Sequence, residues 1–141
     1  MTPNPSLALR EPSERVGRGW TASLSLANGA IWVGWYGPLQ ILLAVQAEDL
    51  APAGTSKETV LAWVTGVGAV VSLAANPLFG AVSDRTTSRW GRRTPWIVAG
   101  TAGGALSLLL LSAADSVWWL AAGWCLVQLT LNAAFAAVTA A

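Results

Sequence analysis

The sequence has no histidine and only one cysteine, Cys125, among its 141 residues. A single cysteine cannot form an intramolecular disulfide, and without histidine a Cys/His metal site has no ligand set. The acidic residues fall in connecting segments without a neighbouring base, so no catalytic set emerges. No cluster of Lys and Arg is mixed with aromatic residues, as a nucleic-acid site would require. We therefore expect no enzyme, no metal, no cofactor and no nucleic-acid partner.

Charge is absent from four long runs of the chain. Residues 19–47, 59–83, 94–114 and 116–141 contain no charged side chain and are 29, 25, 21 and 26 residues long. About 20 helical residues cross a hydrocarbon core roughly 30 Å thick. A soluble chain of this length could not bury four such helices, and the mean hydropathy is +0.52. The sequence predicts an all-α, polytopic membrane helix bundle with helices at about 20–47, 59–82, 95–114 and 117–141.

The positive charges predict how the bundle is oriented. Lys and Arg in short loops tend to remain cytoplasmic. The connection at residues 83–94 carries four arginines against one aspartate, whereas residues 48–58 and the turn at Asp115 are mainly acidic. We expect residues 83–94 to form a cytoplasmic loop, and the Pro-rich, solvated tail at residues 1–18 to lie on the same side. The predicted location is the plasma (inner) membrane, with several crossings.

Amides and aromatic residues gather on one face of the first and fourth predicted helices. An amide in lipid without a partner costs several kcal/mol, so these faces should point at protein or water. They are candidate substrate-binding residues. The alternative is that the aromatic rings fill the bundle and the amides tie helices together. The candidates are Asn28, Trp32, Trp35, Tyr36 and Gln40 in the first helix, and Gln128 and Asn132 in the fourth.

The fourth run ends at residue 141 without a basic or polar anchor, which stable spanning helices usually have. We therefore expect the chain to be a fragment of a longer protein.

Residues 76–97 read NPLFGAVSDRTTSRWGRRTPWI. This segment resembles the cytoplasmic signature loop between the second and third helices of major facilitator superfamily transporters. Its long form is similar to the loop of sugar:cation symporters of the glycoside-pentoside-hexuronide and sucrose-carrier type. The resemblance implies that these are the first four of twelve helices in an alternating-access carrier, with the first and fourth helices lining its cavity. The implied gating residues are Gly80, Asp84, Arg85, Arg89, Gly91, Arg92 and Arg93.

One departure from this family pattern concerns ion coupling. Melibiose-type relatives place acidic cation ligands in the second and fourth helices, and this chain has none there. Coupling to H+ or Na+ would then use acids beyond residue 141, or be absent. The expected partners are the bilayer, a sugar or other small solute with or without such an ion, and the remaining helices of a longer chain.

Two other functions remain open. A four-helix dimeric exporter would resemble small multidrug resistance proteins, but these rely on a glutamate in the first helix, and none lies in residues 19–47. A non-transporting structural subunit would use the amides and glycines only to hold helices together.

Overall fold

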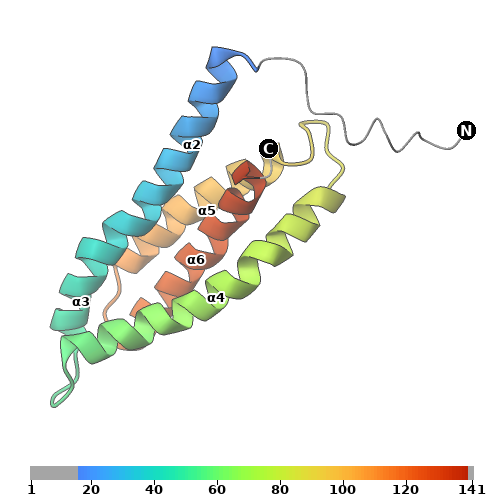
Figure 1. Ribbon diagram of the computed structural model, residues 1–141. Coiled ribbons are helices and arrows are strands. Elements are labelled where there is room, and N and C mark those ends of the chain that lie inside the picture. Colours follow the sequence, from blue (N-terminus) through green and yellow to red (C-terminus); the bar gives the residue numbers. More distant parts are fainter. Residues whose placement is uncertain (1–15, 140–141) are drawn as a thin grey trace, which may run out of the picture.

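The computed structural model describes residues 16–139, so residues 1–15 of the predicted tail (residues 1–18) and the last two residues of the fourth run lie outside the described residues. Within residues 16–139 every regular element is helical, and the all-α prediction is confirmed (Figure 1). Four continuous helices, Arg18–Leu50, Lys57–Arg85, Thr94–Ser112 and Val117–Thr139, are long and apolar enough to cross a membrane. The elements are α2 (Arg18–Gly37), the π-helix η1 (Pro38–Leu42), α3 (Leu43–Leu50), α4 (Lys57–Arg85), α5 (Thr94–Ser112) and α6 (Val117–Thr139).

The helices Arg18–Leu50 and Lys57–Arg85 extend beyond their uncharged runs, and a polar cap sets the start of the second of them. Helix α4 begins after Ser56, whose hydroxyl accepts a hydrogen bond from the backbone N–H of Thr59 at 3.3 Å. A serine in this position satisfies one of the free N–H groups of the first turn. The exposed side chains of Glu48 on α3 and Lys57 on α4 pair at 2.9 Å across the connection between the two helices.

The two prolines within the long helices have different effects. Proline lacks an N–H group and its ring clashes with the preceding turn. The first helix responds at Pro38, where residues Pro38–Leu42 take the wider π-helical turn. Helix α4 remains α-helical through Pro77. The irregular turn therefore lies in the first helix, next to the aromatic residues that the sequence singles out.

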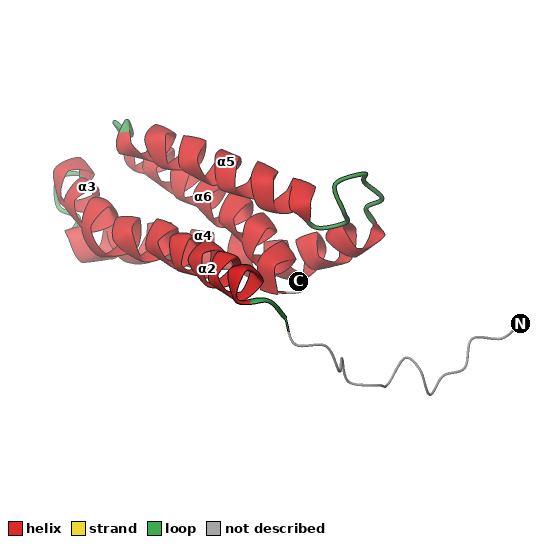
Figure 2. Cartoon of the chain, turned by 90° about the horizontal axis from the view of Figure 1, so that it is seen from above, coloured by secondary structure: helices red, strands yellow, loops and turns green. Residues whose placement is uncertain are grey.

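Helix α6 lies at the centre of the bundle, between α5 on one side and α2 with α4 on the other (Figure 2). It packs closely on α5 because glycines leave room for its backbone. A Cβ atom on Gly100 would lie 2.6 Å from the backbone nitrogen of Ala134, and one on Gly104 would overlap Leu131. Small residues allow such close approach of membrane helices, where dispersion contacts drive association.

Besides its packing on α6, the first helix is attached to the bundle at its α3 end. There the Gln46 side chain donates hydrogen bonds to the carbonyls of Leu111 and Ser112, in the last turn of α5, at 3.0 and 3.4 Å. Toward its amino-terminal end α2 diverges from α4 (Figure 1). The core that contains Leu43, Val64 and Trp124 lies accordingly toward the α3 end.

Large apolar side chains cover much of the outside of the bundle. Leu73 is 80% exposed, Trp118 is 75% exposed and Val33 is 72% exposed. Such surfaces are unfavourable in water and match the acyl chains of a bilayer. With its four spanning helices, the chain is a multi-pass membrane protein.

Candidate functional site

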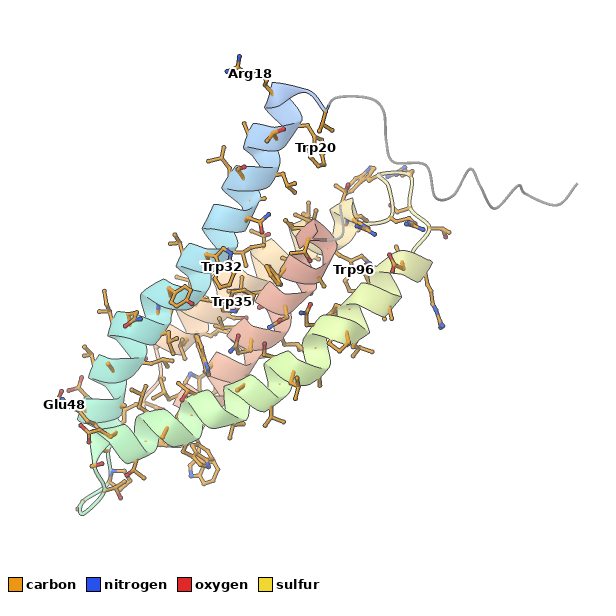
Figure 3. All side chains as sticks on the ribbon, viewed as in Figure 1. Arg18, Trp20, Trp32, Trp35, Glu48 and Trp96 are labelled. Carbon is orange, nitrogen blue, oxygen red and sulfur yellow. The ribbon has the colours of Figure 1, made fainter. Side chains whose placement is uncertain are left out.

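Four aromatic rings from α2 and α6 form a cluster on the inner side of the bundle. Trp32 and Trp35 extend from α2 toward α6 (Figure 3). The ring of Phe135 on α6 lies 5.9 Å from that of Trp32 and 5.3 Å from that of Trp35, both edge-on, and Trp32 stacks on Tyr36 at 5.6 Å. These separations fall within the favourable range for aromatic pairs. The cluster joins the two helices whose polar and aromatic faces the sequence identified.

A cavity of about 210 Å³ opens beside this cluster. A second cavity of about 520 Å³ adjoins it, since Ser72 and Gln128 border both. None of the residues that line the two cavities is charged. The first is lined by Trp32, Trp35, Tyr36, Leu39, Ser72, Trp124 and Gln128, and the second by Ala69, Ser72, Leu73, Asn76, Pro77 and Gln128.

The other three candidate residues lie outside both linings. The amide of Asn28 donates to the carbonyl of Leu24 on its own helix at 3.1 Å. Gln40 is exposed on the π-helical turn. Asn132 is only 2% exposed, and its amide nitrogen donates to the hydroxyl of Ser72 at 3.0 Å. The structure thus brings four of the seven candidates together and places Asn132 in contact with the same site.

Helix α4 contributes a wall to the site that the sequence reasoning did not assign. Ser72 and Asn76 are one helical turn apart, so they share one face of α4, and this spacing was visible in the sequence. Trp124 on α6 is buried against α4 where Gly68 lacks a side chain, and a Cβ atom there would overlap the indole ring. That close approach depends on helix packing and has no local sequence signal.

Two indole nitrogens of this region have no hydrogen-bond partner. Nε1 of Trp35 and Nε1 of Trp124 are both buried without an acceptor. Buried polar atoms of this kind usually find a partner, and functional sites are a common exception. The site therefore offers aromatic faces, a hydroxyl, two amides and unpaired donors, a set suited to binding an uncharged polar molecule.

The connection between α4 and α5 holds the residues predicted to form a gating loop. Asp84 at the end of α4 pairs with Arg93 at 3.2 Å, and Gly91 turns the chain with a φ angle of +92°. Glycine adopts this left-handed conformation without steric cost. Arg89 lies over the ring of Trp90 at 5.9 Å. A Cβ atom on Gly80 would have no neighbour within 4 Å, so the α4 surface is open there.

A second hydrogen bond joins the two ends of the same loop. The indole nitrogen of Trp96 on α5 donates to the hydroxyl of Thr86 at 2.9 Å. Arg85 and Arg92 are exposed, and Nη1 of Arg93 is buried without a partner. The described residues thus bring Asp84 together with one arginine of the predicted set.

A family model for MFS/sugar transport proteins matches residues 55–141, which is more than half of the chain. The chain belongs to this family. The resemblance of the loop at residues 76–97 to major facilitator transporters is thereby confirmed, and it falls inside the matched range. The matched residues 55–141 also include α4 and α6, two of the helices that line the cavity.

Individual relatives of this MFS chain are transport proteins by name. A sucrose transport protein of Arabidopsis thaliana is 33% identical over 84 residues, which are 57% of this chain and 16% of that protein. Solute carrier family 45 member 3 of Mus musculus is 42% identical over 65 residues, 46% of this chain and 11% of that protein. A lactose permease of Lactobacillus helveticus is 43% identical over 42 residues, 30% of this chain and 7% of that protein. The chain thus matches a small part of each relative's length. No solved structure matches it.

Proposed function

We propose that this chain provides part of a carrier that moves a neutral, hydroxyl-bearing solute, a sugar or a related small molecule, across the plasma membrane by alternating access. The observation that carries the proposal is the uncharged cavity bordered by three aromatic rings of α2, Ser72 and Gln128. The names of a sucrose transport protein and a lactose permease among its relatives support the same substrate class.

The chemistry of the cavity favours an uncharged solute. The flat apolar face of an indole or phenol ring complements the C–H face of a sugar ring, while the amide and hydroxyl groups can bond its hydroxyls. An ionised solute would enter a site without a compensating charge, and burying an unpaired charge is costly. Coupling to H+ or Na+ would need acidic ligands in another part of the carrier.

The loop at residues 86–93 is assigned to the cytoplasmic side because of its arginines. In this proposal the pair between Asp84 and Arg93 organises a gate at that side, and the open surface at Gly80 receives a neighbouring helix of the carrier. The amino terminus of α2 would lie on the same side of the membrane.

Access of water to the cavity tests the proposal directly. The test uses the full-length carrier that contains this chain, made free of cysteine by changes that include Cys125→Ser. In this protein we expect Gln128→Cys to react with a membrane-impermeant thiol reagent, and a saturating sugar to slow that reaction. The matched control is Leu109→Cys on α5, whose side chain is 68% exposed, lines neither cavity and should face lipid or a neighbouring helix.

Failure of Gln128→Cys to react from either side of the membrane would contradict the cavity and favour a purely structural role for the helices. Equal reaction of both variants would indicate that the chain is not folded as described. The proposed solute class would be ruled out if no sugar slowed the labelling and the full-length carrier took up no sugar in vesicles.

A further inference from the structure

We infer that Ser72 on α4 donates a hydrogen bond to the solute, and that Asn132 on α6 is the positioning residue that leaves the Ser72 proton free for this bond. This inference rests on the proposed function, because it concerns the same cavity.

The orientation of the Asn132 amide follows from its neighbours. One atom of that amide lies 2.7 Å from the backbone carbonyl of Gln128. A carbonyl can only accept a hydrogen bond, so this atom must be the amide nitrogen. The same nitrogen lies 3.0 Å from the hydroxyl oxygen of Ser72. Its second hydrogen therefore points at Ser72, and Ser72 is the acceptor in that pair.

The Ser72 proton is left without an internal acceptor. Serine and threonine within helices commonly donate back to a carbonyl of the preceding turn. Thr65, Ser107 and Thr130 do so here, each at 2.7 Å. Among the hydrogen bonds of residues 16–139, none has Ser72 as donor. Because Ser72 borders both cavities, its hydroxyl can donate to a solute bound there.

Asn132 itself is not placed to contact a solute through its nitrogen. Both of its amide hydrogens are used, and the residue is 2% exposed. The solute must therefore offer an acceptor oxygen to Ser72, while the neighbouring side chain of Gln128 borders the same space. A sugar hydroxyl meets this requirement.

Binding titrations with single-atom changes on both sides test the inference. The purified full-length carrier in lipid nanodiscs is titrated with methyl α-D-glucopyranoside and its four monodeoxy derivatives. The change in tryptophan fluorescence reports Kd. We expect Ser72→Ala to raise Kd for the parent sugar by roughly threefold to tenfold, the effect of one lost hydrogen bond. For one monodeoxy sugar, the Kd with the unchanged chain should be raised by the same factor. The Kd of that sugar should not rise further in Ser72→Ala.

Two further variants separate positioning from folding. Asn132→Leu should raise Kd as Ser72→Ala does, and the double variant should bind no more weakly than either single one, because both remove the same bond. The control is Ser107→Ala, a buried hydroxyl on α5 that already donates to its own helix and should leave Kd unchanged.

The outcomes distinguish this inference from the proposed function. Sugar binding that Ser72→Ala leaves unchanged would overturn the inference and leave the proposed function standing. Additive losses in the double variant would overturn the positioning role of Asn132. Absence of binding by any of these sugars and by sucrose would overturn the proposed solute class and the inference with it.

Discussion

Replacing Gly68 by alanine should separate α4 from α6 at the cavity. Gly68 is buried, and a Cβ atom there would overlap Cδ1 and Nε1 of the Trp124 indole. That ring is only 2% exposed, so it has little free space to move into except the adjoining cavity of about 210 Å³. The added methyl group must shift either the indole or the helix.

The magnitude follows from comparison with Gly66→Ala on the same helix. Gly66 is exposed and a Cβ atom there meets nothing within 4 Å. Alanine favours a helix over glycine by about 1 kcal/mol at either position, so this gain is common to both variants. Overpacking a filled interior costs about 1–3 kcal/mol. The free energy of unfolding of Gly68→Ala should therefore lie about 1–3 kcal/mol below that of Gly66→Ala.

The assay is unfolding of the purified chain by SDS in mixed micelles, followed by far-ultraviolet circular dichroism. A cycle with Trp124→Leu tests the cause: the smaller side chain makes room, so the cost of Gly68→Ala should shrink in that background. Displacement of the indole into the cavity should also raise the Kd for a bound sugar. Equal stabilities of the two glycine variants, or strictly additive costs in the cycle, would refute the reasoning.

Other perturbations address the packing of α5 and the predicted gate. The free energy of unfolding of Gly100→Ala should lie about 1–3 kcal/mol below that of Gly66→Ala, because its Cβ atom would lie 2.6 Å from a backbone nitrogen of α6; equal SDS midpoints of these two variants would contradict this. Thr86→Val removes the acceptor of the Trp96 indole and should cost about 0.5–1.5 kcal/mol, whereas the exposed Thr87→Val should change stability by less than about 0.5 kcal/mol; similar losses in both would show that the bond contributes nothing. Asp84→Asn breaks an ion pair in which the Asp84 side chain is 56% exposed and should change stability by less than about 1 kcal/mol, yet it should slow sugar uptake by the full-length carrier roughly tenfold, and normal uptake would argue against gating.

The number of helices was predictable because charge is expensive in lipid. Four uncharged runs, each long enough to span, leave a short chain few alternatives, and the structure has four corresponding helices. The family resemblance was equally readable, since it depends on a contiguous loop at residues 76–97. Helix ends were less predictable, because Lys57–Arg85 starts before its uncharged run, at the Ser56 cap, whereas Thr94–Ser112 ends before its run does.

The composition of the cavity was predictable only in part. Trp32, Trp35, Tyr36 and Gln128 could be proposed from helical spacing, because polar and aromatic residues on one helix face must avoid lipid. Spacing on a single helix does not tell which side chain of another helix will be opposite. The sequence therefore could not reveal that Asn132 meets Ser72 across α4 and α6.

The sequence by itself determined that this chain is helical, spans a membrane and belongs with sugar transporters, because these properties depend on runs of residues and on a local motif. Only the tertiary structure decided which face of α4 joins the cavity, how Trp124 lies over Gly68 and which hydroxyl keeps a free proton. These features depend on how closely two helices approach and on their relative rotation, and both are set by packing between residues that lie far apart in the chain.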